Sequence, residues 1–177
     1  MKTKVIYLAG GCFWGTEHFL SLIPGVLKTE VGYANSLIDN PSYRLVCTGS
    51  TQAVETVKVT YDPERVSLSF ILDLFYKTID PTSINRQGND QGTQYRTGIY
   101  FIDEDDKAIV QKSLLDLQNE YSKPIQIEYG RIKNFFPAEE YHQDYLLKNP
   151  GGYCHINPSL FKLAKNASDP TVNKTKD

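Results

Sequence analysis

The chain has 177 residues, of which 40% are hydrophobic and 23% are charged, and its formal net charge is −2. These values are typical of one soluble globular domain that is large enough to bury a hydrophobic core. No block of basic residues is present, so the charge pattern argues against nucleic acid or an anionic membrane as a partner. No apolar run has the length of a membrane span, and the first residues lack a signal-peptide pattern, so we expect a cytoplasmic protein.

Three cysteines, Cys12, Cys47 and Cys154, lie far apart in the chain and form no Cys-x-x-Cys motif. This spacing does not fit the disulfide framework of a small secreted domain. No pair of cysteines or histidines has the spacing of a structural zinc site, so we expect no metal. In a reducing compartment, such cysteines are either inert core residues or catalytic and redox-active ones.

Cys12 follows a predicted strand and precedes a predicted helix. The apolar run Lys4–Ala9 is typical of a buried strand, Gly10-Gly11 predicts a sharp turn, and apolar residues at helical spacing predict a helix through Ile23. A thiol at the first residues of a helix experiences unpaired N–H groups and the positive end of the helix dipole, which favour the reactive thiolate. A small buried core cysteine explains the same local pattern equally well.

A second functional candidate lies on the clearest strand of the sequence. After a predicted strand over Val26–Tyr33, a loop and a helical turn over Tyr43–Cys47, the alternating segment Glu55–Tyr61 predicts a strand with one apolar face. Glu55 has the parity of that apolar face, and burial raises the pKa of a carboxyl. Alternatively, the strand begins one residue later and Glu55 turns to solvent.

The middle of the chain alternates helices with strands. Ser67 is expected to cap a helix that ends at Asp80-Pro81. The long polar segment 82–96, with Asp90 and Tyr95, predicts an ordered, hydrogen-bonded loop, with disorder as the alternative. The next predicted elements are a strand, a helix capped by Asp103, a second strand and a helix that Pro137 opens; their ranges are 97–102, 103–121, 124–129 and 137–149.

This order of elements predicts an α/β fold, a two-layer sandwich resembling a ferredoxin-like core, with a loop-rich C-terminal segment. We expect one domain over residues 1–156. The polar residues 157–177 are expected to form a largely disordered tail or linker, despite a short apolar patch at Leu160, Phe161 and Leu163.

Several motifs together resemble one known family, the A-type methionine sulfoxide reductases, or peptide-methionine (S)-S-oxide reductases. The resemblance extends over nearly the whole chain to about Ile156. The matching motifs are Gly10-Gly11-Cys12-Phe13-Trp14-Gly15 with Glu17, Pro41-x-Tyr43, Cys47-x-Gly49, Glu55, Asp80-Pro81, Arg86-Gln87-Gly88-Asn89-Asp90-x-Gly92-Thr93-Gln94-Tyr95-Arg96, Ala138-Glu139-Glu140-Tyr141-His142-Gln143-x-Tyr145 and Asn149-Pro150-x-Gly152-Tyr153-Cys154.

The resemblance implies a catalytic cycle without metal or cofactor. Cys12 would attack the sulfur of methionine-(S)-sulfoxide, free or in proteins, while Glu55 supplies an acid or a hydrogen bond to the sulfoxide oxygen. Methionine would leave and Cys12 would remain as a sulfenic acid. Cys154 would then resolve it to a Cys12–Cys154 disulfide, which thioredoxin reduces. The resemblance further implies protein repair under oxidative stress by a monomer.

Five more residues receive roles in substrate binding from the resemblance. Phe13 and Trp14 would hold the methyl group of the substrate, and Tyr43 and Tyr95 would present hydroxyls to the sulfoxide oxygen. Asp90 would orient the loop and the substrate in the same site. The physical chemistry agrees, because the sulfoxide oxygen must gain a proton and a carboxyl kept neutral by burial is a suitable donor.

The sequence departs from the family pattern at two places. Gln52-Ala53-Val54 stands where members commonly have Gly-His-Ala, so the local support of the Glu55 strand is expected to differ. No cysteine follows Cys154, which implies a cycle with one disulfide, and Cys47 is expected to be a buried structural residue. The ending Tyr153-Cys154-His155-Ile156 and the polar tail also resemble the A domain of A–B fusion proteins.

Two other classes of function fit parts of the pattern. A cysteine hydrolase would pair Cys12 with His18, His142 or His155, but no histidine has a local setting that marks it as the base, and Cys154 would have no task. A sulfoxide-binding module without catalysis would bind the substrate and release no methionine, so turnover with dithiothreitol separates it from an enzyme.

Overall fold

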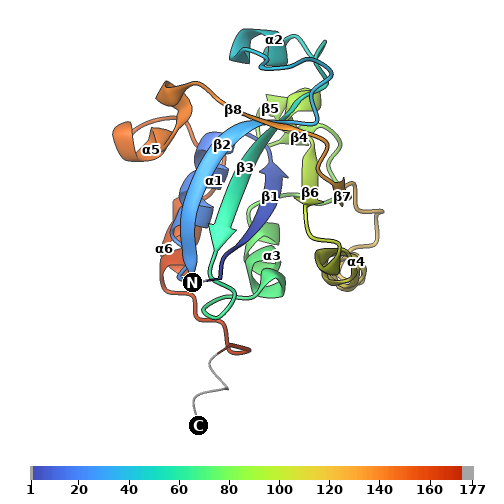
Figure 1. The fold of residues 1–177 in the computed structure, drawn as a ribbon, viewed down its shortest axis with the longest axis vertical. Helices are drawn as coiled ribbons and strands as arrows, with labels where there is room; N and C mark the ends of the chain where they lie inside the picture. Colours follow the sequence, from blue (N-terminus) through green and yellow to red (C-terminus); the bar gives the residue numbers. More distant parts are fainter. Residues whose placement is uncertain (1, 173–177) are drawn as a thin grey trace.

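A computed structural model of the chain describes residues 2–172. The described residues form a mixed α/β fold (Figure 1). The strands are β1 Lys4–Gly10, β2 Val26–Ala34, β3 Val54–Tyr61, β4 Arg86–Gln87, β5 Asp90–Gln91, β6 Thr97–Phe101, β7 Glu128–Arg131 and β8 Phe135–Pro137. The helices are α1 Phe13–Ser21, α2 Tyr43–Cys47, α3 Leu68–Tyr76, α4 Asp105–Gln118, α5 Tyr145–Lys148 and α6 Pro158–Lys165, with 3-10 turns over Thr93–Tyr95 and Glu140–His142.

Six of the strands form one sheet in the order β7-β6-β1-β3-β2-β8, and β4 and β5 form a separate hairpin. All neighbours in the large sheet are antiparallel except β6 and β7. The succession β1, α1, β2, β3, α3, β6 is a β-α-β-β-α-β order, with α2 and the β4–β5 hairpin inserted. The predicted α/β class is therefore confirmed.

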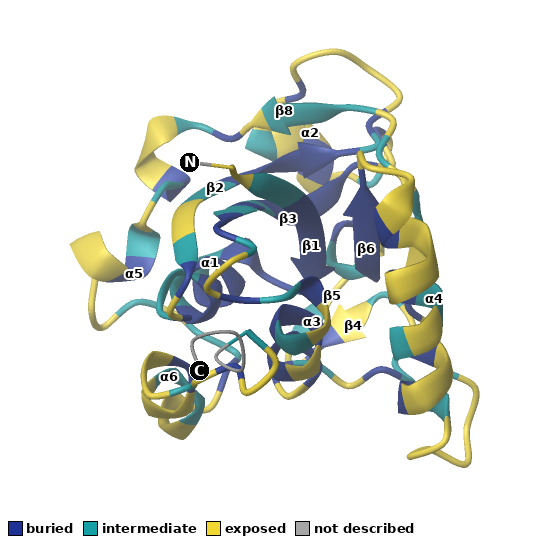
Figure 2. Ribbon diagram, turned by 60° about the horizontal axis from the view of Figure 1, so that its bottom comes forward, coloured by how far each residue is buried: buried dark blue, intermediate teal, exposed yellow. Residues whose placement is uncertain are grey.

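The two faces of the sheet are covered differently. One face packs against α1, α3 and α4 and forms the large core, which includes Ile6, Val57, Phe19 and Phe75. The other face carries a small cluster around Tyr7 and its neighbours, covered by Phe135 from β8 and by Ile132. Figure 2 shows the central strands buried and the outer surface of α4 exposed. The fold is thus two layers, with the helices mainly on one side.

The strand-to-helix turn after β1 has the sharp geometry that the glycines predict. Gly11 has φ +87°, a conformation that side chains other than glycine rarely adopt. A Cβ atom at Gly11 would also lie 2.7 Å from the side chain of Gln87, and one at Gly10 would lie 2.8 Å from Phe75. The turn therefore requires both glycines, and it places Cys12 at the N-cap of α1.

The helix predicted over residues 137–149 is wrong. Pro137 ends β8, where it pairs with Gly32, and only the 3-10 turn and the short helix α5 follow. The side chain of Gln143 accepts a hydrogen bond from Val31 N at 2.9 Å and donates one to Val31 O at 2.9 Å. Asp144 then has φ +50°. These tertiary bonds and the left-handed residue interrupt the helical periodicity.

Two smaller differences concern the bounds of a predicted strand and a predicted helix. The strand predicted from residue 124 begins at Glu128, because Ile125 N donates to the Gln118 side chain at 2.9 Å and Gln126 N donates to Pro81 O at 2.6 Å. These bonds hold the segment away from the sheet. The helix capped by Ser67 ends at Tyr76, before the predicted stop at residues 80–81.

The prediction of a largely disordered tail is wrong for residues 157–172. Asn157 caps helix α6, whose Ala164 is fully buried and whose Phe161 ring meets His18 of α1 at 4.6 Å. Asp169 then accepts hydrogen bonds from the backbone N and the hydroxyl of Ser67, at 2.8 and 2.7 Å. Side-chain caps and a few apolar contacts thus order a polar sequence. Residues 173–177, which belong to the same prediction, lie outside the described residues.

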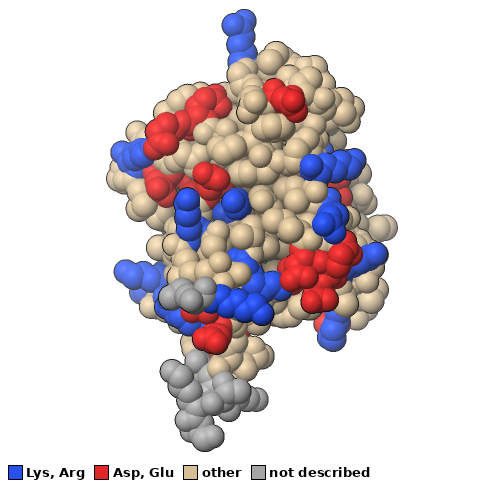
Figure 3. Space-filling model, in the orientation of Figure 1, with Lys and Arg blue, Asp and Glu red and all other residues tan. Residues whose placement is uncertain are grey.

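The surface carries both signs of charge. On the face drawn in Figure 3, acidic and basic side chains are interspersed, with uncharged surface between the groups. Among residues 2–172 no helix is long and apolar enough to cross a membrane.

Candidate active site

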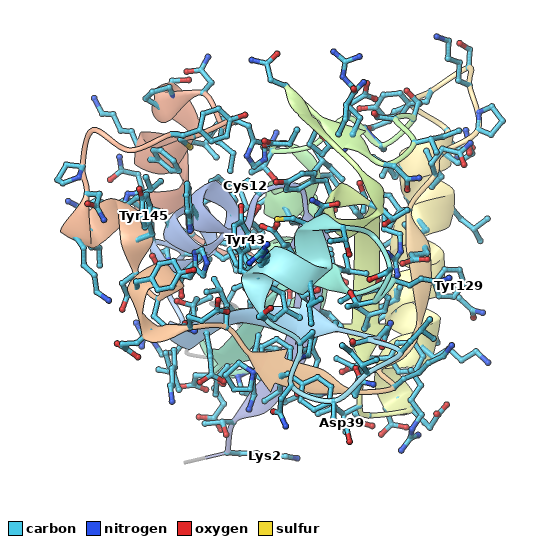
Figure 4. All side chains as sticks on the ribbon, turned by 90° about the horizontal axis from the view of Figure 1, so that it is seen from above. Lys2, Cys12, Asp39, Tyr43, Tyr129 and Tyr145 are labelled. Atoms are coloured by element: carbon cyan, nitrogen blue, oxygen red, sulfur yellow. The ribbon has the colours of Figure 1, made fainter. Side chains whose placement is uncertain are left out.

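Cys12 lies where β1, α1 and the inserted segments meet. Its thiol is free and its residue is only 7% exposed. Seen from above, Cys12 at the start of α1 and Tyr43 on α2 lie next to each other near the centre of the molecule (Figure 4). The strand-turn-helix segment therefore presents the thiol to residues of the inserted segments.

The surroundings of Cys12 do not favour a thiolate. Burial raises the pKa of the Cys12 thiol far above its ordinary value, and the nearby carboxyl of Glu55 raises it further. The backbone hydrogen bond from Trp14 lowers the pKa, but by less. Of the two alternatives for Cys12, the thiolate stabilised by the helix dipole is therefore not favoured, because desolvation outweighs the dipole.

Glu55 has the inward orientation that the alternation of β3 predicts. It is 2% exposed, and its Oε1 accepts a hydrogen bond from Phe13 N at 3.3 Å. Its other oxygen, Oε2, is buried and has no hydrogen-bond partner among the described residues. Burial raises the pKa of Glu55 to about 8, so the carboxyl is mostly neutral at pH 7 and carries a proton that it can donate. The prediction of a raised pKa is confirmed.

Two phenols lie near the thiol and the carboxyl. Tyr43 is the first residue of α2, and Tyr95 ends a 3-10 turn in the segment 82–96. Burial raises the pKa of both phenols, and the proximity of Glu55 raises both further. Cys12 is an electrostatic neighbour of both phenols as well, so the four groups form one cluster. Both phenols remain protonated and can donate hydrogen bonds.

Arg96 fixes the turn that carries Tyr95. Its guanidinium donates to Thr93 O at 2.8 Å, to Gln52 O at 2.9 Å and to the carboxylate of Glu128 at 2.7 Å. Gln52 has φ +55°. Gln52 belongs to the segment Gln52-Ala53-Val54, where the sequence departs from the family pattern. Arg96 binds the carbonyl of Gln52 and so connects the residues before β3 to the turn that carries Tyr95. The segment 82–96 is ordered, as predicted.

Trp14 and Phe13 form an aromatic cluster with residues from the C-terminal part of the chain. The indole Nε1 of Trp14 donates to Nδ1 of His142 at 2.9 Å, and the indole stacks on Tyr145 at 3.7 Å with 10° between the planes. Phe13 is fully buried and its ring lies 5.2 Å from that of His142. Sequence reasoning considered His142 only as a candidate base of a hydrolase and assigned no role to Tyr145, although both belong to the matching motif 138–145.

Asp90 and Cys154 reach the site from separate segments. Asp90 on β5 accepts a hydrogen bond from the hydroxyl of Tyr153 at 3.1 Å. Cys154 is half-buried and lies against α1, because a Cβ atom at Gly15 would be 2.8 Å from its Sγ. The structure thus brings the predicted site residues to one end of α1.

Cys47 differs from its prediction. It is exposed at the end of α2, rather than buried as a structural residue. The thiol lies beside the hydroxyl of Tyr43, and the amphipathic turn α2 buries Val46 instead. In this helix Val46 is buried and Tyr43 packs partly against the core, an arrangement that the local sequence does not specify.

The three histidines have other partners than Cys12. His142 binds Trp14, His155 Nε2 lies 3.0 Å from Gly10 O, and His18 packs on Phe161. None of these contacts provides a base for a cysteine hydrolase. Among residues 2–172, no three His, Cys, Asp or Glu side chains are grouped so that they could hold a metal ion.

A second buried carboxyl, Glu17 on α1, binds the C-terminal part of the chain. It is 2% exposed, and its Oε1 accepts a hydrogen bond from Asp144 N at 2.7 Å, which anchors the start of α5. Burial raises the pKa of Glu17 to about 7. Above the unfolded value of 4.5, the folded state binds more protons, so stability falls as pH rises toward 7.

We therefore expect Glu17→Gln to lose less stability than the wild type between pH 5 and pH 8. The amide oxygen still accepts a hydrogen bond from Asp144 N, but no buried charge forms. The difference in the free energy of unfolding between the two proteins should therefore change by roughly 2–3 kcal/mol over this range. Urea unfolding at both pH values measures it. An identical pH dependence in the two proteins would contradict the assignment.

The fold and the site define a class of protein. A buried thiol, a carboxyl that carries a proton, two phenols and a second free thiol at one end of a helix are the parts of a thiol-based redox enzyme. The profile of the family described as peptide methionine sulfoxide reductase matches residues 4–173, and the chain belongs to this family.

Individual relatives agree with the family assignment. The chain is 56% identical over 164 residues to "Peptide methionine sulfoxide reductase MsrA" of Lachnoclostridium phytofermentans, covering 93% of this chain and 99% of the relative. It is similar to the crystal structure of reduced Mxr1 from Saccharomyces cerevisiae, with a TM-score of 0.84, 40% identity and coverage of 88% and 92% of the two chains. It is also similar to Mxr1 in complex with Trx2, with a TM-score of 0.59, 27% identity and coverage of 81% and 85%.

Proposed function

We propose that this chain reduces methionine-(S)-sulfoxide, free and in proteins, to methionine, with Cys12 as the nucleophile. The observation that carries the proposal is the neutral, buried carboxyl of Glu55 in the same cluster as the buried thiol. Membership of the peptide methionine sulfoxide reductase family supports the reaction and its substrate. The role in the cell is then the repair of oxidised methionine.

The first step transfers oxygen from the substrate to Cys12. The sulfur of Cys12 attacks the sulfoxide sulfur while Glu55 donates its proton to the sulfoxide oxygen, and the proton of the thiol returns to the carboxylate. The oxygen then passes to the Cys12 sulfur, which becomes a sulfenic acid, and the substrate sulfur leaves as methionine. Cys12 loses two electrons and the substrate gains two. Protonation of the oxygen makes the sulfur electrophilic enough for a thiol whose own pKa is raised.

The substrate is held by aromatic and polar groups on two sides of the thiol. Trp14, fixed by His142 and Tyr145, provides a rigid apolar wall for the methyl group, with Phe13 behind it. Tyr43 and Tyr95 donate hydrogen bonds to the sulfoxide oxygen without adding charge. Asp90 holds the segment that carries Tyr153 beside the same site.

The second step closes a disulfide and returns the enzyme to its starting state. The Cys154 sulfur attacks the sulfur of the sulfenic acid, the S–O bond breaks and water leaves with the thiol proton. Thioredoxin, a dithiol, then reduces the Cys12–Cys154 disulfide. The complex of the similar protein Mxr1 with Trx2 supports this partner. We further propose that the enzyme acts as a monomer in the cytoplasm, where thiols are kept reduced.

An assay with separated epimers tests the proposed function. With dithiothreitol as reductant, we expect methionine from the S-epimer of a sulfoxide substrate and none from the R-epimer, because the methyl group and the oxygen have fixed partners. Cys12→Ser is the matched control and should release none from either. Equal rates on both epimers, or sulfoxide binding without release of methionine, would overturn the proposal.

A further inference from the structure

The segment that carries Cys154 is docked on both sides of the cysteine. Before it, the hydroxyl of Tyr153 donates to Asp90 at 3.1 Å. After it, Nε2 of His155 lies 3.0 Å from Gly10 O. The preceding Gly151 has open space around it. Gly152, by contrast, donates its N–H to Asn149 O at 2.8 Å. The residues on either side of Cys154 thus add two direct contacts, with β5 and with the glycine turn, to that anchor.

The side chain of His155 packs against Gly11 and Gly88, where neither glycine has a side chain. A Cβ atom at Gly11 would lie 3.2 Å from Nε2 of His155, and one at Gly88 would lie 3.3 Å from its Cβ. A carbonyl oxygen only accepts, so Nε2 carries the hydrogen and donates to Gly10 O. Burial lowers the pKa of His155, and Nδ1 is buried without a hydrogen-bond partner among the described residues. The neutral ring is thus held by one directional bond to the turn that bears Cys12.

Gly15 leaves room for the thiol of Cys154 on the first turn of α1. A Cβ atom there would lie 2.8 Å from Cys154 Sγ and 3.3 Å from Ile156. The Sγ atom accepts a hydrogen bond from Ile156 N at 3.4 Å. Cys12 is the N-cap of the same helix, so the second thiol rests against the helical turn that Cys12 begins.

We propose that His155 is a positioning residue for the second step of the reaction, because it holds Cys154 against the first turn of α1, where Gly15 leaves room for it. The inference rests on the proposed role of Cys154 as the resolving cysteine. Holding the thiol near the sulfenic acid gives the intramolecular attack a high effective concentration, which a free segment loses. The ring of His155 binds Gly10 O and not either thiol, so it acts through Cys154.

The proposal predicts that the two steps separate in variants at these positions. In His155→Ala, the first methionine should be released within about twofold of the wild-type rate, while closure of the Cys12–Cys154 disulfide slows by about tenfold or more. His155→Gln should recover part of the closure rate, because its amide N–H can donate to Gly10 O. Rapid quenching without reductant gives both rates, from methionine and from sulfenic acid trapped by a 1,3-dione.

Gly15→Ala provides an independent test that does not depend on His155. Alanine is the better helix former by about 1 kcal/mol, so this variant should not lose helix propensity, but its Cβ displaces Cys154. As in His155→Ala, we expect methionine release close to the wild-type rate and slower closure of the Cys12–Cys154 disulfide. Unchanged closure in both variants, or an equal loss of both steps in His155→Ala, would overturn the inference alone. A wild type that releases methionine but never joins Cys12 to Cys154 would overturn the proposed resolving role and this inference with it.

Discussion

Replacing Glu55 with glutamine should slow the release of methionine by about 10²- to 10⁴-fold, the range that a positioned general acid contributes. The amide can still donate a hydrogen bond to the sulfoxide oxygen, but it has no proton to transfer. The pKa of Glu55 is raised to about 8, so the active acid form exists below this pH. The wild-type rate of the first step should therefore fall as pH rises through about 8, and the slow rate of Glu55→Gln should lack this decline. Single-turnover methionine release across pH measures both.

Glu17→Gln is the matched control for this experiment. It also removes a buried carboxyl with a raised pKa from the same region, but Glu17 binds Asp144 N and not the thiol cluster. This variant should keep both the rate and the pH profile of the wild type. If Glu55→Gln kept the wild-type rate, the carboxyl would not be the acid, and the phenols of Tyr43 and Tyr95 would have to supply the proton.

Replacing Cys154 with serine should abolish turnover with thioredoxin while leaving the first turnover intact. Serine has no thiol to attack the sulfenic acid, so one methionine per chain is released and Cys12 stays oxidised. Dithiothreitol is small enough to reduce the sulfenic acid directly and should restore turnover. Methionine formed per chain, with each reductant in turn, is the measurement.

Cys47→Ser is the control for a nonspecific loss of thiols. Cys47 is exposed and lies beside Tyr43, but the proposed cycle gives it no redox step, so this variant should turn over with thioredoxin at close to the wild-type rate. Thioredoxin-driven turnover by Cys154→Ser would show that another thiol resolves Cys12, and the loss of that turnover in Cys47→Ser would identify it.

Periodicity predicted those parts of the fold in which local pattern and burial agree. The run Lys4–Ala9, the glycine turn and the alternation of β3 gave their elements and the inward orientation of Glu55. The helix predicted from Pro137 failed because Gln143 binds β2, a contact that local sequence does not reveal. The ordered tail was missed for the same reason, since Asp169 finds its partner about a hundred residues earlier, at Ser67.

The chemistry of the site was only partly predictable. Local sequence indicates a helix N-terminus at Cys12, which favours a thiolate, but the burial that dominates its pKa comes from the whole fold. The family resemblance supplied roles for individual residues. It could not show that Arg96 binds Gln52 or that His155 binds Gly10, because each bond joins segments that only the folded chain brings together.

The central claim is that Cys12 takes the oxygen of a sulfoxide and is then joined to Cys154. The most direct measurement mixes the reduced protein with excess S-sulfoxide and no reductant, counts the methionine and maps the disulfide by mass spectrometry of peptides. The account predicts one methionine per chain and one disulfide, between the peptides that contain Cys12 and Cys154. Absence of methionine, or a disulfide that leaves Cys12 free, would contradict it.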